Sequence, residues 1–182
     1  KHITEIRVYS IPQADWTLEL DGQNIGGLHY DVSKTYFESA LACQFGANHK
    51  ATYTDTKDRV WEGMPLWFLV GFVDDADQHS NNAFNEELAR DGYQVLITAA
   101  DGSTVTIDSA DITRNNNNYI VANSLNGVTI PDTDSNWPLR LVGKAVTGAT
   151  SIKQIESIKL VSSTPRLAYT VEPVADDIYT AG

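Results

Sequence analysis

The stretch "VWEGMPLWFLVGFVDD", residues 60–75, is the densest apolar run in an otherwise polar and acidic chain. Gly63 and Pro65 make a rigid turn within it, because proline fixes its own φ at about −65° and glycine admits conformations closed to other residues. Pro65 at a first helical turn and Gly71 after the last follow the usual placement of these residues around a helix. The stretch therefore predicts a strand and a turn that lead into a short helix, anchored in the core by its large apolar side chains.

The bulk composition describes one globular domain with an acidic surface. The chain has 182 residues, of which 42% are apolar and 20% charged, and its formal net charge is −11. Such a surface repels phosphate backbones and anionic lipid, so we expect neither nucleic acid nor an anionic membrane as a partner. No apolar run approaches the roughly 20 residues that a membrane span requires. We expect a single domain over residues 1–165, followed by a tail or linker over 166–182.

The residue usage also predicts a compartment. The single cysteine, Cys43, excludes internal disulfides and a thiolate-rich zinc site. Lysine is scarce, whereas Asn, Thr, Ser and Asp are frequent, and the chain begins at Lys1 rather than at Met, as a mature or trimmed fragment does. We therefore expect an exported protein, whether extracellular, periplasmic or attached to a cell surface.

Most of the chain alternates apolar and polar residues with a period of two, which is typical of half-buried strands. Asp101–Gly102 and Asn126–Gly127 each interrupt such an alternation and predict the tight turn of a hairpin. The segments that predict strands are residues 16–23, 93–108, 119–131, 137–145 and 156–163.

Helical signals are few. Residues 33–42 predict a helix capped by Ser33, and residues 83–93 predict another, with Asn81 or Asn82 as the N-cap and Gly92 beyond its end. Several strands with a few short helices indicate an α+β domain that is mainly β.

Three segments in order carry a resemblance to a known family. The first is Trp61-Glu-Gly63-Met-Pro65-Leu66-Trp-Phe-Leu69-Val70, the second is "WPLRLVG" at residues 137–143, and the third is "GATSIKQIESIKL" at residues 148–160. Together they resemble the molybdopterin-binding domain of the sulfite oxidase family, including its bacterial periplasmic sulfoxide-reductase branch. The resemblance implies mixed sheets or a barrel-like arrangement with few short helices, in a divergent member of the family.

The resemblance also implies a cofactor and its ligands. In catalytic members a cysteine thiolate binds molybdenum or tungsten upstream of the first segment, and here Cys43, on a predicted strand, takes the place of the catalytic metal ligand. A thiolate suits a transition metal that changes oxidation state during oxygen-atom transfer. Arg140, Ser151 and Lys153 would contact the pterin, since they offer guanidinium, hydroxyl and ammonium donors. The implied function is oxidoreductase-like chemistry on a small molecule, with a redox partner protein.

Other features of the sequence favour a non-catalytic alternative. The family's pterin pocket uses an early His-Asn pair and several arginines, whereas this chain offers His29 and His49, and only Arg7 and Arg59 before residue 89. An unpaired cysteine such as Cys43 is also typical of a small buried residue. The alternative hypothesis is an exported surface or ligand-binding module that keeps the fold and has lost the cofactor.

A third hypothesis is a domain of the adhesion type stabilised by calcium. Residues 75–86 place oxygen or nitrogen ligands at the spacing of an EF-hand loop, but Ser80 stands where the sharp turn needs glycine. These ligands are Asp75, Asp77, His79, Asn81 and Glu86. Residues 132–136, "DTDSN", form a second such cluster. The alternative reading of both is a solvated polar loop, and no hydrolase or phosphate-loop motif is present.

The tryptophans allow two interpretations. Aromatic rings can line a face that binds sugars or other ligands. However, Trp16, Trp61 and Trp137 fall where the strand and turn patterns predict burial, so we expect them in the core.

Overall fold

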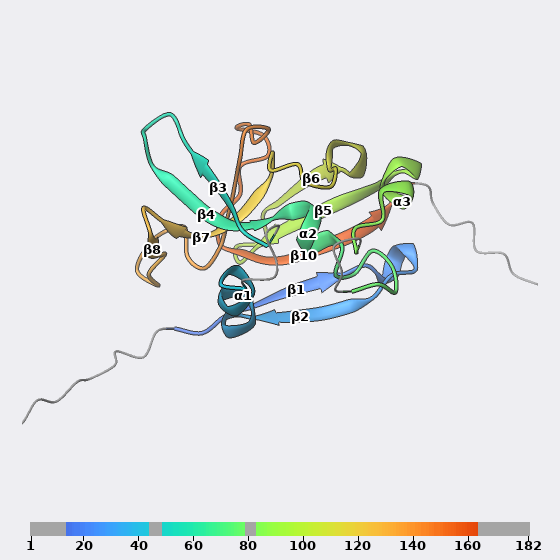
Figure 1. Cartoon of the computed structure of the whole chain (residues 1–182), viewed down its shortest axis with the longest axis horizontal. Coiled ribbons are helices and arrows are strands. Elements are labelled where there is room, and N and C mark those ends of the chain that lie inside the picture. The colour runs from blue at the N-terminus through green and yellow to red at the C-terminus, as the bar shows by residue number, and fades with distance from the viewer. Residues whose placement is uncertain (1–13, 44–48, 79–82, 164–182) are drawn as a thin grey trace, which may run out of the picture.

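The structure is a computed structural model that describes residues 14–43, 49–78 and 83–163. It contains two five-stranded β-sheets and a few short helices (Figure 1). The prediction of a mainly β α+β domain with a mixed sheet is confirmed. The barrel-like alternative is wrong, because no strand of one sheet pairs with a strand of the other in the described residues. None of the helices in these ranges is long and apolar enough to cross a membrane.

The first sheet joins the beginning of the described chain to its end. Its strand order is β2-β1-β10-β5-β6, and all neighbours are antiparallel except β1 and β10, which are parallel. These strands are β1 (Thr17–Asp21), β2 (His29–Ser33), β5 (Tyr93–Ala99), β6 (Thr104–Asp108) and β10 (Ile155–Ser162). The β5–β6 hairpin turns at Asp101–Gly102, as the sequence predicts.

The second sheet centres on β7, which pairs with β4 on one side and with β8 and β9 on the other. Its strands are β3 (Ala51–Thr54), β4 (Val60–Pro65), β7 (Ile120–Leu125), β8 (Val128–Thr129) and β9 (Arg140–Val142). Gly63 of β4 is required here, since a Cβ at this position would lie 2.0 Å from the carbonyl oxygen of Val121. The glycine therefore permits the close approach of β4 and β7.

The helices α1 (Lys34–Leu41), α2 (Leu66–Val70) and α3 (Glu86–Asp91) are short, as are the 3-10 turns η1 (Gln23–Ile25) and η2 (Ser109–Asp111). The Ser33 hydroxyl caps α1 by accepting the Tyr36 N–H at 3.2 Å, which confirms that prediction. The cap of α3 differs, because Asn85 accepts the Leu88 N–H at 3.0 Å. The N-cap is the residue just before the helix, and α3 begins at Glu86. The predicted caps, Asn81 and Asn82, lie outside the described residues.

The second sheet has apolar clusters on both faces. The main core lies between the sheets and includes every residue of α2. A smaller cluster forms on the outer face of the second sheet around Trp61, with Ala51, Ile120, Ala122, Ile130 and Val142. Trp16 and Trp61 are buried, as predicted. Trp137 lies in a loop and is only half-buried, although it packs against both clusters.

Candidate functional site

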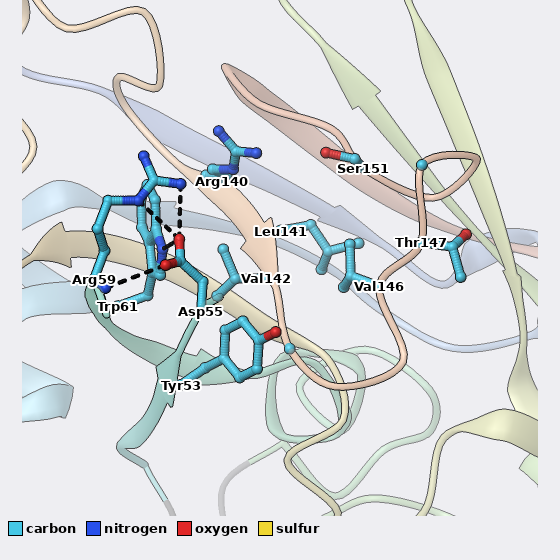
Figure 2. Close-up of a pocket in the computed structure, with 12 residues that line it drawn as sticks. Tyr53, Asp55, Arg59, Trp61, Arg140, Leu141, Val142, Val146, Thr147 and Ser151 are labelled. Atoms are coloured by element: carbon cyan, nitrogen blue, oxygen red, sulfur yellow. Dashed lines mark hydrogen bonds and ion pairs between the residues drawn. The ribbon is translucent and has the colours of Figure 1, made fainter. Parts of the chain in front are cut away.

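An open cavity of about 260 Å³ lies on the outer face of the second sheet, next to the small cluster (Figure 2). We call it the arginine cavity, after Arg59 and Arg140. Three parts of the chain form its wall: the β3–β4 hairpin, strand β9, and the loop that leads to β10. The residues that line it are Tyr53, Asp55, Arg59, Trp61, Arg140, Leu141, Val142, Gly143, Val146, Thr147, Gly148 and Ser151.

Asp55 shapes the hairpin that carries one wall of the cavity. Its Oδ1 accepts the backbone N–H groups of Lys57 at 2.9 Å and of Arg59 at 3.1 Å, and its own N–H donates to the Arg59 carbonyl at 3.0 Å. Asp58 completes the turn with a φ of 58°. Aspartate is favoured at such a position because its side chain bonds the backbone two residues on.

The second oxygen of Asp55 fixes two side chains in the cavity. Asp55 Oδ2 accepts the Trp61 Nε1–H at 3.0 Å, the Arg59 Nε–H at 2.8 Å, and lies 2.7 Å from Arg59 Nη2 (Figure 2). These hydrogen bonds, from Trp61 first and then from Arg59, hold the pKa of Asp55 well below its usual range. The carboxylate therefore stays ionised and balances the charge of Arg59.

Arg140 brings a second guanidinium to the same indole. The Cζ atoms of Arg59 and Arg140 each lie 5.3 Å from the centroid of the Trp61 ring, a distance at which a cation is attracted to the ring face. Arg140 Nη1 donates to Asn136 Oδ1 at 2.5 Å, and no carboxylate among the described residues forms an ion pair with it. Burial, followed by repulsion from Arg59, lowers the pKa of Arg140. Attraction from Asp55 and Asp134 opposes this lowering, but neither carboxylate forms an ion pair with Arg140. Among the described residues, Arg59 is therefore the only one of the two guanidinium groups that has a carboxylate in direct contact.

The remaining wall is a loop rich in small residues. Gly143 has a φ of 137°, and a Cβ there would lie 2.0 Å from the Asn118 carbonyl oxygen, so no larger residue fits without a shift. Thr147 and Thr150 close a turn, with the Thr147 N–H donating to Thr150 Oγ1 at 2.9 Å. Ser151 follows this turn and adds a hydroxyl to the lining.

The structure brings together two of the three predicted pterin ligands. Arg140 and Ser151 line the same cavity, although they come from different segments. Lys153 pairs with Arg140 through the backbone, but it is exposed and does not line the cavity. Its role as a pterin ligand stays a prediction.

Cys43 lies elsewhere. It lies two residues after Leu41, the last residue of α1, and its N–H donates to the Ala40 carbonyl at 3.1 Å. The expected strand is wrong, because Cys43 follows the C-terminal turn of a helix instead. The preceding residue, Ala42, lines a separate cavity together with Glu62. Glu62 and Trp61 are consecutive in β4, so their side chains point to opposite faces of the second sheet.

This placement tests the fit of the predicted cofactor. The arginine cavity offers cationic and hydroxyl donors, which fit the anionic part of a pterin cofactor. Cys43 is not among its lining residues, and in the described ranges no group of three metal-ligating side chains includes Cys43. The described residues therefore fit an oxyanion at this cavity and do not supply a thiolate beside it.

The two predicted calcium loops have ordinary turn contacts in the structure. Asp75 accepts the Asp77 N–H at 2.7 Å and the Asn85 Nδ2–H at 2.9 Å, and Asp134 accepts the Asn136 N–H at 2.8 Å. His79 and Asn81 lie outside the described residues. Calcium at either loop stays a prediction.

Sequence reasoning missed the pairing of Asp55 with Arg59. The signal was present in "YTDTKDRVW", residues 53–61, where an acid and a base four residues apart fall in a turn between two strands. Trp61 is the second residue of β4, and its indole completes the cluster.

Comparison with known proteins adds one likeness. No protein-family profile matches the sequence, and no curated protein matches it. The structure is similar to the sulfane dehydrogenase SoxCD from Paracoccus pantotrophus, with a TM-score of 0.48 and 15% sequence identity. The likeness covers 80% of this chain and 38% of the SoxCD chain, so this chain spans well under half the length of that protein.

Proposed function

We propose that the chain is a ligand-binding module whose arginine cavity holds a small oxyanion. The observation that supports this most is Arg140, a half-buried guanidinium that hydrogen-bonds only a neutral amide among the described residues. A guanidinium presents its donors in a planar fork that matches carboxylate, sulfate or phosphate oxygens. An oxyanion at Arg140 would supply the direct ion pair that this guanidinium lacks among the described residues.

The charge of the cavity supports the same proposal. Its lining contains two cations, Arg59 and Arg140, and one anion, Asp55, whereas the whole chain carries a formal charge of −11. A concave site with an excess of positive charge concentrates the field that attracts an anion. Trp61 and Tyr53 add flat aromatic surface, and Ser151 adds a hydroxyl that can donate to a bound oxygen.

A molybdopterin-binding, oxidoreductase-like function is the second candidate. It is favoured by one observation, that Arg140 and Ser151 line the same cavity although only the sequence resemblance had linked them. When bound, such a cofactor supplies oxygen-atom-transfer chemistry. In this candidate the oxyanion would be the pterin phosphate, and no step is assigned to Cys43 because it does not line the cavity.

Titration calorimetry with inorganic phosphate and with sulfate tests the first candidate. We expect Arg140→Gln to weaken binding by roughly tenfold or more, since a charge-assisted hydrogen bond contributes about 1.5–3 kcal/mol. Lys153→Gln is the matched control, because it removes an exposed cation that pairs with the same backbone but lies outside the lining. Equal losses in the two variants, or no binding by the wild type, would refute an oxyanion site at Arg140.

Metal analysis of protein from its native source tests the second candidate. Molybdenum or tungsten at about one atom per chain, lost in Arg140→Gln, is the expected result if the cofactor is bound at this cavity. Protein that carries neither metal, and yet binds phosphate through Arg140, would support the binding module alone.

A further inference from the structure

A second cavity, of about 460 Å³, lies at one end of the first sheet and shares no lining residue with the arginine cavity. We call it the tryptophan cavity. Its wall comes from the start of β1, the start of β10, the β5–β6 turn and the loop before β9. The side chains that decide its chemistry are Asp15, Trp16, Glu19, Trp137 and Glu156.

The charged residues of this cavity are all acidic. Neither lysine nor arginine is among the described residues that line it, whereas Asp15, Glu19 and Glu156 are. Lys159 balances Glu19 from the sheet, at 3.0 Å between Nζ and Oε1. Asp15 accepts only a neutral N–H, from Trp16 at 2.9 Å, and Glu156 is exposed with no ion-pair partner in the described ranges. Within the described part of the chain, Asp15 and Glu156 thus have no cationic partner.

The aromatic residues supply the complementary feature. The Trp16 ring is held by an edge contact with Phe37 at 5.4 Å between centroids, and the half-buried Trp137 packs against both apolar clusters. Indole is the best aromatic partner for a cation, because its ring face is negative. Two tryptophans and two carboxylates that lack a cationic partner among the described residues match a cation that also has apolar surface.

The walls of the cavity are held in place by backbone hydrogen bonds. The Ala100 N–H donates to the Gln154 carbonyl at 2.9 Å, and the Ile155 N–H donates to the Leu139 carbonyl at 3.2 Å. Gln154 has a φ of 58°, a conformation that costs free energy in any residue other than glycine. The cavity is therefore largely preformed, as small-molecule sites usually are.

We propose that the tryptophan cavity binds a small alkylammonium cation, with its charge at Asp15 and Glu156 and its carbon groups against Trp16 and Trp137. A calcium ion fits less well, because it takes six to eight oxygen ligands at about 2.3–2.6 Å and gains nothing from indole rings. A phosphate or sulfate is repelled by the carboxylates.

Titration of the whole chain with tetramethylammonium chloride, followed by the NMR signal of the Trp137 indole N–H, tests this proposal. Sodium chloride at equal concentration corrects for ionic strength, and glucose probes a neutral ligand that would stack on the same rings. We expect tetramethylammonium to shift the Trp137 signal in a saturable way, and sodium and glucose to leave it unchanged. Saturable binding of glucose without binding of tetramethylammonium would overturn the proposal.

Variants locate the cation. Glu156→Gln should weaken tetramethylammonium binding by roughly threefold to tenfold, the size expected when one carboxylate is lost from a cation–aromatic site. Asp132→Asn, an exposed acidic residue outside the lining, is the matched control. The Trp137 variants lack that indole, so their binding is followed through the Trp16 indole N–H signal in the same cavity. Trp137→Phe, which keeps an aromatic ring, should weaken tetramethylammonium binding less than Trp137→Leu. Equal affinity in the wild type and in Glu156→Gln and Trp137→Leu would contradict the site.

Discussion

The arginine cavity and the tryptophan cavity lie beside the same two segments of chain, yet the side chains that line them are opposite in charge. Trp137 lines the tryptophan cavity, and three residues later Arg140 lines the arginine cavity. Likewise, Ser151 lines the arginine cavity, and three residues later Gln154 lines the tryptophan cavity. The two segments are joined by a backbone hydrogen bond from the Leu141 N–H to the Ile152 carbonyl, at 3.0 Å.

The comparison shows why net charge alone does not predict ligands. A formal charge of −11 describes the average field of the chain, but the hairpin that carries Arg59 and the strand that carries Arg140 place two cations together. The tryptophan cavity retains the acidic character of the chain as a whole.

Gly143→Ala should remove the arginine cavity and destabilise the domain by about 3 kcal/mol or more, because the new Cβ meets the Asn118 carbonyl in a strained backbone conformation. Gly102→Ala is the control at the turn beside the tryptophan cavity. Gly102 has a φ of 81° but open space around it, so the expected cost is about 1 kcal/mol. Urea unfolding measures both, and equal losses would show that the crowding at Gly143 is relieved by movement of the loop.

Asp74→Asn should change how stability depends on pH without affecting either cavity. Asp74 is buried; its Oδ2 accepts the Asn85 N–H at 2.8 Å, and its Oδ1 has no partner in the described residues. Burial raises the pKa of Asp74 to about 7. The folded state thus binds a proton more tightly than the unfolded state, whose aspartate pKa is about 3.9.

The sign of the effect follows from this difference. Between about pH 4 and pH 7 the free energy of unfolding should fall as pH rises, by at most about 1.4 kcal/mol per pH unit, and above pH 7 this contribution is constant. Asp74→Asn should flatten that slope in thermal or urea unfolding at pH 5, 6, 7 and 8. An unchanged slope would show that Asp74 is ionised in the folded protein throughout this range.

Asp55→Asn should destabilise the domain at neutral pH and have less effect in acid. The pKa of Asp55 is lowered by its bonds to Trp61 and Arg59, so its ionised form stabilises the folded state above the unfolded pKa of about 4. This contribution is lost as pH falls toward the lower folded pKa. We therefore expect the variant to be less stable than the wild type at pH 6, and the difference to shrink at pH 3. A constant difference would refute a charged role for Asp55.

Arg140→Lys tests the geometry of the arginine cavity separately from its charge. Lysine keeps the positive charge but lacks the planar fork and stacks less well on Trp61. Phosphate binding should weaken by roughly fivefold, less than in Arg140→Gln, if both charge and shape contribute. Affinity equal to the wild type would mean that charge alone determines binding.

The smallest expected effect is that of Lys159→Met on the tryptophan cavity. Lys159→Met removes the ion pair with Glu19, so the Glu19 carboxylate becomes available to a bound cation. Because an exposed ion pair contributes about 0.2–1 kcal/mol, tetramethylammonium should bind roughly twofold more tightly. Phosphate binding should not change. A weaker affinity for tetramethylammonium would contradict the assignment of cation binding to the acidic lining.

Local patterns predicted much of the fold. The period-two alternation and the Asp101–Gly102 and Asn126–Gly127 turns gave the hairpins, and Ser33 gave the start of α1, because each depends on residues close in sequence. The pairing of β1 with β10 and the outer apolar cluster depend on contacts between distant segments, which periodicity does not encode.

The candidate site was predicted only in part. Arg140 and Ser151 were named from the sequence, whereas the contribution of Asp55, Arg59 and Trp61 depends on how the β3–β4 hairpin folds over β9. The position of Cys43 could not be predicted, since a residue at the end of a helix and one on a strand both suit an apolar segment. The exported location and the domain boundary at residue 165 remain predictions.

One NMR experiment tests the contrast between the two cavities most directly. The indole N–H signals of Trp61 and Trp137 report on the arginine cavity and the tryptophan cavity in the same sample. We predict that phosphate shifts the Trp61 signal and leaves Trp137 unchanged, and that tetramethylammonium does the reverse. If both ligands shift the same indole, or if neither shifts either one, the two cavities are not sites of opposite charge preference.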